Sequence, residues 1–431
     1  MNEPVPPYPV RPSACPGLLR IVPAADGGLC RVKLPGGVLL AAQAEALAGA
    51  AQRYASGVME ATNRANLQLR GVIGGGGDLQ RALLGAGLGP ALPGGDDVRN
   101  LMLSPLAGLD PRQVFDARPL AAQLLQLLER EPRYHGLSPK FALQVDGGEA
   151  LACLDHPHDV WLAPLWHAGQ WQWGLGLASS PGQGTMVAAL KPAEALAAVA
   201  AVLDRFLALA NSEHTRMRQV IEAVGLEGFL APLNLCRASQ RCPPRPASGA
   251  PGQYPQNPGG SVAVCAQFAL GRFEAGQLRA LAGLCRQWGD GALRLTPWQG
   301  VLLAGVAQAH ARPLQEALRA LGLLVDAAAP LASLVACAGA TGCAKARADT
   351  KADARHLATL LAPPRPVHVT GCERACAAPH GAPFTLLAVA HGRYDLFIRD
   401  GAHPGFGQLR ARELTLQAAA TLLNGLPRSD T

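Results

Sequence analysis

The chain has 431 residues, 49% of them hydrophobic and 16% charged, and it carries a formal net charge of +7. This length is too great for one ordinary core and predicts about two to four domains. Aromatic residues make up only 5% of the chain, and no run of basic residues interleaves with them, which argues against a nucleic-acid partner.

The beginning of the chain does not resemble an export signal. It carries Glu3 and several prolines where a signal peptide would have an apolar core. We therefore expect a cytoplasmic, reducing location, in which free cysteines persist.

The first module reads as strand, helix, strand and strand, a pattern that suits an antiparallel sheet covered by a helix. The glycine run 74–77 that follows lacks the Lys-Ser/Thr of a phosphate-binding loop, so we interpret it as a turn. No dinucleotide fingerprint opens a βαβ unit, so we expect NAD(P)H to supply electrons only indirectly, through a partner reductase. The predicted elements are a strand at 29–34, a helix at 41–54, and strands at 57–61 and 66–71.

A longer segment, 75–165, follows this module and is rich in helical pattern, with one strand expected near 140–145. It contains the densest group of histidines and carboxylates in the chain, formed by His156 and His158 with Asp155 and Asp159. A loop group of this kind is most often solvated, and the chain has no clear facial triad of two histidines and a carboxylate.

The longest apolar-rich segment, 186–210, is interrupted by charged residues such as Lys191 and Asp204. Their spacing leaves an apolar stripe, which predicts an amphipathic helix and excludes a membrane span. The stretch 242–260 is dense in Pro, Gly, Ser and Gln and predicts a flexible linker.

After the linker the first module recurs. Shifting the chain by 234 residues aligns 31–72 with 265–306 without a gap, and 12 of these 42 positions are identical. Chance alone would give far fewer identities, so the chain contains two copies of one module. In this alignment Trp298 and Gln299 stand where the first copy has Arg64 and Ala65. An aromatic ring at position 298 suits either stacking on a flat ligand or filling the core.

Four of the eleven cysteines form two close pairs near the end of the chain, Cys337-x5-Cys343 and Cys372-x3-Cys376. Four thiolates brought together are what an iron–sulfur cluster requires. The spacings fit the tetrahedral knuckles of zinc poorly, and a disulfide is disfavoured in a reducing compartment. We interpret the other cysteines as buried small hydrophobic residues: Cys15, Cys30, Cys153, Cys236, Cys242, Cys265 and Cys285.

The two halves differ in this respect. Matching 101–104 with 334–337 places Ser104 where the second half has Cys337, so we expect only one half to hold a cluster.

A duplicated module that alternates with two larger segments, the second bearing these cysteines, resembles the nitrite and sulfite reductase superfamily. The resemblance covers roughly 16–400 and implies an α+β fold with pseudo-two-fold symmetry, in which ferredoxin-like half-domains accompany two larger α/β domains. It also implies that Cys337, Cys343, Cys372 and Cys376 hold a [4Fe-4S] cluster, with Cys376 bridging to the iron of sirohaem where sirohaem is bound.

The implied domains are a first half-domain at 11–73, a cluster-free domain at 75–215, a connecting helix and linker at 216–260, a second half-domain at 261–309, the cluster domain at 310–405 and a C-terminal extension at 406–431.

Within the superfamily, the strings 11–18, 30–37, 62–71 and 104–110 resemble those of the precorrin-3B synthase family. That resemblance implies a monooxygenase that hydroxylates precorrin-3A with O2 and closes a lactone during aerobic cobalamin (vitamin B12) biosynthesis. An external reductase would supply the electrons. A mononuclear iron is also implied, with ligands that the sequence does not assign, and the catalytic residues stay unknown.

Departures from the reductase pattern favour this family over a sirohaem-dependent sulfite or nitrite reductase, which stays open as the alternative. Arg374 stands where reductases usually have asparagine, and Lys140-Phe141-Ala142 replaces a Lys-x-Lys pair at the anion site. The threonine-arginine-glutamine signature that contacts sirohaem is replaced by 63–66. A non-catalytic iron–sulfur or zinc scaffold is a third possibility.

The resemblance places basic residues around a central cavity, where guanidinium groups suit the carboxylates of a macrocycle. The alternative to a substrate-binding role for Arg64 is a purely structural ion pair with Glu60. The substrate-binding candidates are Arg31, Lys33, Arg64, Arg99 and Lys140, followed by Asn66, Gln68 and Arg70.

Overall fold

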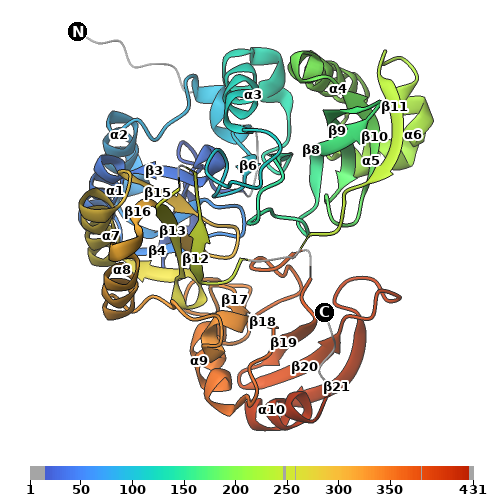
Figure 1. Cartoon of the computed structure of the whole chain (residues 1–431). Helices are drawn as coiled ribbons and strands as arrows, with labels where there is room; N and C mark the ends of the chain where they lie inside the picture. The colour runs from blue at the N-terminus through green and yellow to red at the C-terminus, as the bar shows by residue number, and fades with distance from the viewer. Residues whose placement is uncertain (1–14, 246–248, 258, 380, 427–431) are drawn as a thin grey trace.

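The computed structural model describes residues 15–245, 249–257, 259–379 and 381–426. The described chain forms a central body of two half-domains and two outer lobes (Figure 1). The first outer lobe follows the first half-domain, and the second, coloured orange to red, ends the chain. Half of the string 11–18 and the start of the predicted domain 11–73, residues 11–14 in both cases, lie outside the described residues.

Each half-domain has the elements that the duplicated pattern predicts. Strand, helix and paired strands occur in the same order in both copies, which confirms the duplication. The first copy comprises β1 (Val22–Ala24), β2 (Gly27–Val32), α1 (Ala41–Tyr54), β4 (Val58–Ala61), β5 (Leu67–Val72) and α2 (Gly77–Gly85). The second comprises β12 (Gly252–Pro255), β13 (Ser261–Gln267), α7 (Ala275–Trp288), β15 (Ala292–Leu295), β16 (Gly300–Ala307) and α8 (Gln308–Ala320).

The half-domains exchange one short strand each. The first sheet has the order β1-β2-β5-β4-β14, and its edge strand β14 (Arg272–Glu274) comes from the second copy. The second sheet has the order β12-β13-β16-β15-β3, and its edge strand β3 (Val38–Leu40) comes from the first copy. Each half-domain therefore needs the other to complete its sheet.

A glycine precedes both exchanged strands, and the duplication pairs these two glycines. Gly37 has a φ of +74°, and a Cβ there would lie 2.5 Å from the carbonyl oxygen of Leu295. Gly271 has a φ of +72° and approaches the carbonyl oxygen of Ala61 in the same way, at 3.1 Å. Only glycine combines this left-handed backbone with so close an approach.

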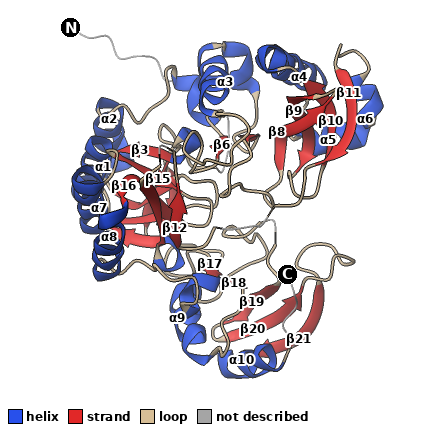
Figure 2. Ribbon diagram, in the orientation of Figure 1, coloured by secondary structure: helices blue, strands red, loops and turns tan. Residues whose placement is uncertain are grey.

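One hydrophobic core serves both half-domains. It contains Leu47 of α1 and Leu281 of α7, both fully buried, together with residues of α2 and α8. These helices form one layer against the outer face of the two sheets (Figure 2). The sheets are thereby held side by side, with their other faces turned toward the outer lobes.

The outer lobes share one sheet topology. In each sheet, the first three strands from one edge run parallel to one another, and the fourth strand runs antiparallel to the third. The first sheet has the order β11-β10-β9-β8-β7-β6, built from β6 (Leu101–Leu103), β7 (Leu143–Val145), β8 (His158–His167), β9 (Gln170–Ser179), β10 (Thr185–Leu190) and β11 (Cys236–Arg241). The second has the order β17-β18-β19-β20-β21, built from β17 (Leu334–Ala336), β18 (Val367–Thr370), β19 (Phe384–Ala390), β20 (Arg393–Ile398) and β21 (Gln408–Leu414).

Helices flank both of these sheets. The first lobe has α3 (Arg118–Arg130), α4 (Ala195–Leu209), α5 (Met217–Val224) and α6 (Leu226–Leu230), and the second has α9 (Thr350–Leu360) and α10 (Leu416–Gly425). Short 3-10 helices complete the chain at η1 (Pro35–Gly37), η2 (Gly74–Gly76), η3 (Pro93–Asp97), η4 (Pro132–Gly136), η5 (Pro192–Glu194), η6 (Ala269–Gly271) and η7 (Pro330–Ser333).

Two predicted elements differ from the structure in informative ways. The segment 186–210 is not one helix, because Pro192 separates β10 from α4. The glycine run forms the η2 turn, as expected, with Gly75 and Gly76 in the left-handed region. None of the described helices has both the length and the hydrophobicity of a bilayer span.

Several domain limits lie elsewhere than the sequence suggested. Residues 217–241 belong to the first lobe, because α5 packs in its core and β11 extends its sheet. Helix α8 packs in the shared core rather than with the cluster domain. The expected extension at 406–431 instead contributes β21 and α10 to the second lobe, where Leu423 is fully buried, and residues 427–431 lie outside the described part.

The exchanged strand β3 allows a test of whether the second half-domain depends on the first for its stability. Leu39 is fully buried against the second sheet, whereas its neighbour Leu40 is 51% exposed. We expect Leu39→Ala to lower the free energy of unfolding by about 2–5 kcal/mol, and Leu40→Ala to change it by less than about 0.5 kcal/mol. Urea unfolding of both variants measures this difference, and equal effects would mean that β3 contributes little to the second sheet.

Candidate functional site

The four paired cysteines lie at one edge of the second lobe. Cys337 directly follows β17 and Cys372 follows β18 after one glycine, so both leave the carboxyl ends of neighbouring parallel strands. Cys343 and Cys376 lie in the loops that continue from them.

The burial of these cysteines separates them from most of the others. All four are free thiols and are half-buried or exposed, whereas Cys30, Cys153, Cys265 and Cys285 are buried as small hydrophobic residues would be. Cys15, Cys236 and Cys242 are more exposed than that interpretation predicted.

The sulfur atoms are close together but not as close as zinc would hold them. Burial raises the pKa of the Cys376 thiol, and the nearby charges of Cys372, Cys337 and Cys343 raise it further. Yet in the described chain no three of these sulfurs lie within 4.8 Å of one another. Sulfurs that bind one tetrahedral zinc ion lie about 3.8 Å apart. The four sulfurs are therefore not gathered in this structure as the ligands of one zinc ion would be.

Close backbone contacts shape the loops around these sulfurs. The N–H of Gly371 donates to the Cys337 sulfur at 3.3 Å, and a Cβ on Gly371 would lie 2.5 Å from that of Ala346. The Thr350 hydroxyl lies 3.4 Å from the Cys337 sulfur. A hydrogen bond to a thiolate stabilises its charged form, the form that binds metal.

Two buried cations fix the loops that carry the first cysteine pair. The Lys351 ammonium donates to the carbonyl oxygens of Leu270, at 2.6 Å, and of Ala336, at 3.2 Å. Arg70, from the first half-domain, donates to the carbonyl oxygen of Gly342. Because Ala336 and Gly342 directly precede Cys337 and Cys343, these contacts position both ligands from outside their own loops.

One carboxylate lies between these cations. Glu60 contacts Arg272 at 2.8 Å, Arg70 at 3.6 Å and Lys351 at 3.7 Å. Burial would raise the pKa of Glu60, but the charges of Lys351, Arg70 and Arg272 outweigh it and lower that pKa. The ion pair between Glu60 and Arg64 that the sequence suggested is therefore replaced by contacts with three other cations.

A second group of arginines lies without carboxylate partners. Within the described chain, neither Arg31 nor Arg64 forms an ion pair, and both are half-buried. Burial lowers the pKa of Arg31, although the nearby thiols of Cys15 and Cys376 raise it. Burial also lowers the pKa of Arg64, to about 10, and the charge of Arg216 acts in the same direction. Both side chains stay cationic at neutral pH.

The partner of Arg31 is an uncharged amide. Arg31 and Gln68 face each other across β2 and β5. With the amide turned so that its oxygen faces the guanidinium, that oxygen accepts bonds of 3.3 Å and 2.7 Å. Gln68 therefore orients Arg31 without neutralising it.

Other predicted site residues are held in structural contacts. Lys33 is buried, and its ammonium donates to the carbonyl oxygens of Asp96 and Asp97 at 2.7 and 2.8 Å. The Asn66 side-chain oxygen accepts from the N–H of Leu34 at 2.8 Å. These contacts join the first half-domain to the first lobe and shape the turn before β5.

Arg70 and Arg99 are held in ion pairs, although Arg99 also lines the small cavity described below. Arg70 is paired with Asp26 at 2.6 Å, and Arg99 with Glu129 at 2.6 Å. Lys140 is exposed and lines neither of the two cavities described below. Its contact with a ligand stays a prediction.

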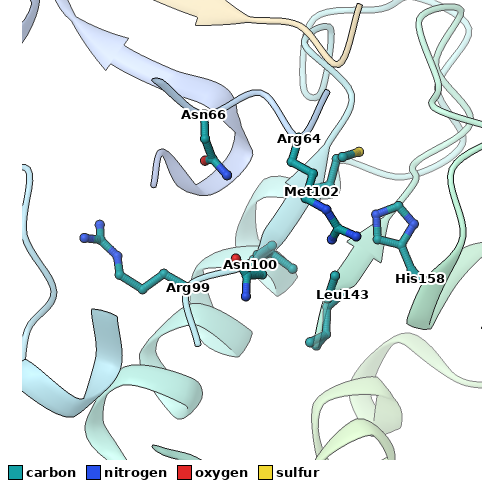
Figure 3. Close-up of a pocket in the computed structure, with 9 residues that line it drawn as sticks. Arg64, Asn66, Arg99, Asn100, Met102, Leu143 and His158 are labelled. Carbon is teal, nitrogen blue, oxygen red and sulfur yellow. The ribbon is translucent and has the colours of Figure 1, made fainter. Parts of the chain in front are cut away.

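A small cavity lies between the first half-domain and the first lobe (Figure 3). In this view Arg64 points toward His158, whereas Arg99 points away from them. Ala142 also lines the cavity, at the position where reductases have the second lysine of Lys-x-Lys. The complete lining is Arg64, Asn66, Arg99, Asn100, Leu101, Met102, Ala142, Leu143 and His158.

A larger cavity of about 340 Å³ lies where both half-domains and both lobes meet. Asn63 and Pro297, which the duplication pairs, enter it from the two half-domains, with Trp298 beside Pro297, and Asp155 and His156 enter from the first lobe. Ala377 and Ala378, directly after Cys376, close it on the cluster side. The side chain of Trp298 therefore forms part of the cavity wall, where a flat ligand can stack on its ring.

Sequence reasoning undervalued the histidine and carboxylate group at 155–159. Only Asp155 is exposed, whereas His156, His158 and Asp159 are all buried. Asp159 pairs with Arg216 at 2.8 Å and accepts from the N–H of Met217. The solvated interpretation is therefore wrong for most of the group.

Comparisons with known proteins agree with this fold. The model of the nitrite/sulfite reductase ferredoxin-like half domain matches 23–74 and 254–321, and the model of the nitrite and sulphite reductase 4Fe-4S domain matches 94–238. The second model supports an iron–sulfur cluster, although the matched range is the first lobe and the four cysteines follow it.

Two kinds of curated relative are similar to the chain over most of its length. The precorrin-3B synthase of Sinorhizobium sp is 28% identical over 98% of this chain and 90% of its own. The chloroplastic ferredoxin–nitrite reductase of Zea mays is 30% identical over 81% of this chain and 67% of its own. Among solved structures, the NirA protein of Mycobacterium tuberculosis matches with a TM-score of 0.76 at 21% identity, over 92% of this chain and 79% of that one.

The contacts of Glu60 predict a pH-dependent stability. Glu60→Gln leaves the buried Arg70 and Lys351 and the half-buried Arg272 without their shared counter-charge, so we expect it to lower the free energy of unfolding by about 3–5 kcal/mol at pH 7. Because the pKa of Glu60 is lowered on folding, its contribution is present above the unfolded value of 4.5 and is lost as pH falls through the folded pKa. Urea unfolding of both proteins at pH 7 and below pH 4.5 should show the gap closing in acid. Glu45→Gln, at an exposed ion pair with Arg286, is the control, and a gap independent of pH would contradict the assignment.

The cysteine arrangement predicts which thiols are needed for the cluster. We expect Cys343→Ser to remove most of the iron and acid-labile sulfide of anaerobically purified protein, whereas Cys285→Ser, in the buried face of α7, leaves both unchanged. Iron, zinc and sulfide analysis measures this. Bound zinc with no sulfide in the unaltered protein would exclude the cluster.

Proposed function

The chain belongs to the nitrite and sulfite reductase superfamily, and from this membership we propose that it is an oxidoreductase of the precorrin-3B synthase type. Its reaction is the hydroxylation of precorrin-3A by O2 with formation of a lactone, which prepares ring contraction in aerobic cobalamin biosynthesis. The reaction takes up O2, two electrons and two protons, places one oxygen atom in the product and releases the other as water. The extent of the similarity to a precorrin-3B synthase, 98% of this chain and 90% of the relative, supports this choice.

The pair of arginines without carboxylate partners carries the proposal. A half-buried guanidinium is costly unless an anion compensates it. Arg70 satisfies this requirement internally through Asp26 and Glu60, whereas Arg31 and Arg64 do not. A macrocycle with several carboxylates supplies the missing counter-charges, and planar guanidinium groups match carboxylates in geometry.

The position of these two arginines would hold the bound substrate close to the cluster. Arg31 lies close enough to Cys376 for their charges to interact, and Arg64 interacts in the same way with Cys153. Cys337, Cys343, Cys372 and Cys376 would hold a [4Fe-4S] cluster, which supplies electrons received from an external donor. Arg31 and Arg64 bind substrate carboxylates between the cluster and the first lobe.

Other residues keep this arrangement in place. Gln68 orients Arg31, and Trp298 offers a flat apolar surface in the larger cavity on which a ring can stack. Lys33, Asn66, Arg70 and Arg99 act as positioning residues, because their polar groups already bond within the protein.

A sirohaem-dependent nitrite or sulfite reductase is the second candidate, and the 30% identity to a ferredoxin–nitrite reductase favours it. The lining of the small cavity favours the first candidate. Reduction of a small oxyanion requires positioned cations and proton donors, yet Ala142 stands there in place of a lysine and Lys140 lies outside.

Anaerobically purified protein distinguishes these functions. We expect no extractable sirohaem, and oxygen-dependent conversion of precorrin-3A when a reductase and NAD(P)H are added. We also expect Arg64→Met to weaken precorrin-3A binding at least about tenfold, because a buried charge pair is lost, while Arg312→Met at an exposed position of α8 leaves binding unchanged. Stoichiometric sirohaem with reduction of nitrite or sulfite would overturn the proposal, as would equal affinity in the Arg64 and Arg312 variants.

A further inference from the structure

A short loop of the first lobe brings three different metal-binding groups together. One ligand atom each of Cys153, Asp155 and His156 lies within 4.8 Å of the others. Thiolate, carboxylate and imidazole are all ligands of first-row transition metals. This group is separate from the four cysteines of the second lobe, and the ion pairs found in the described chain do not include Asp155.

Hydrogen bonds from outside the loop fix its backbone. The Gln144 amide donates to the carbonyl oxygen of Cys153 at 2.7 Å, and the N–H of Gly182 donates to that of Leu154 at 2.8 Å. The His158 ring bonds to the carbonyl oxygen of His156 at 2.9 Å. With the carbonyl groups of Cys153, Leu154 and His156 held in this way, the side chains project from a defined frame, as a metal site requires.

The three residues differ in how far they are exposed, and two of them line the larger cavity. Cys153 is 2% exposed and His156 6% exposed, whereas Asp155 is exposed. Asp155 and His156 both line the cavity of about 340 Å³, whose opposite wall includes Ala377 next to Cys376. An ion bound by these three groups would therefore have the cavity on its remaining side.

We propose that Cys153, Asp155 and His156 bind one divalent first-row transition-metal ion whose remaining coordination positions face the larger cavity. Three protein ligands with open positions are typical of catalytic rather than structural metal sites. The Cys153 thiol donates to the Asp155 carboxylate at 3.9 Å, which accounts for the approach of these two groups. The burial of His156 beside them does not follow from the interpretation of a buried cysteine next to a solvated loop. Metal binding requires no assumption about the reaction. That a small oxygen ligand occupies the open position rests on the proposed function.

Cobalt(II) is the probe, because a thiolate bound to it gives a charge-transfer absorption band. Anaerobic protein with its full content of acid-labile sulfide is dialysed against Co²⁺, and bound metal is counted. We expect one ion per chain beyond the iron that the sulfide accounts for, together with the thiolate band. Cys153→Ser should abolish the band, and Asp155→Asn should weaken cobalt binding at least about tenfold. Cys242→Ser, another partly buried cysteine of the same region, should retain both.

The results that would overturn the proposed metal site are also specific. A band that survives Cys153→Ser would assign the bound cobalt to other thiols and overturn the proposal, as would the absence of excess metal. Because Cys153 is buried, its replacement could unfold the loop, so the exposed Asp155 provides a second variant. Unchanged cobalt affinity in Asp155→Asn, with an unchanged melting temperature, also overturns the site.

The same samples separate this inference from the proposed function. Stoichiometric cobalt binding in protein that does not convert precorrin-3A supports the metal site and refutes the reaction. Conversion of precorrin-3A by protein that binds no excess metal supports the reaction and refutes the site.

Discussion

The arrangement of the whole molecule depends on one buried carboxylate that is shared by three cations. Glu60 belongs to the first half-domain, Arg272 to the strand donated by the second, and Lys351 to the cluster lobe. A buried charge is tolerated only when its partners are present, so this group penalises any separation of the three segments. Lys351 and Arg70 also lie close enough to Cys337 and Cys343, respectively, for their charges to interact.

The two outer lobes show how one duplicated scaffold acquired two different chemistries. The strand that precedes Cys337 corresponds to the strand that precedes Ser104, and the strand that precedes Cys372 corresponds to the one before Asp146. In the first lobe Asp146 is paired with Arg245, and burial beside Asp146 raises the pKa of Glu149. An ion pair with the linker thus occupies the place where the second lobe gathers its sulfurs. Function has diverged at the loops, while the strands that support them have kept their order.

Much of this organisation could be predicted from the sequence, and the remainder was inaccessible for physical reasons. Helices and strands of the half-domains follow from periodicity and duplication, and the cysteine spacing identifies the cluster ligands as candidates. The exchanged strands span three residues each, which is too short for a periodic signal. Two of the three partners of Glu60, Arg272 and Lys351, lie more than 200 residues from it, and no local pattern links either of them to it. The cavities likewise form only where four separate segments meet.

The reciprocal exchange of edge strands has a consequence for how the protein is made. While a ribosome is still producing the linker, β4 of the first half-domain has no neighbour on one side, because β14 emerges only with residues 272–274. An open sheet edge in a partly synthesised chain invites pairing with other nascent chains. Completion of the central body, and with it docking of the loops that hold the sulfurs, must therefore await most of the translation product, which makes maturation a late, all-or-nothing event.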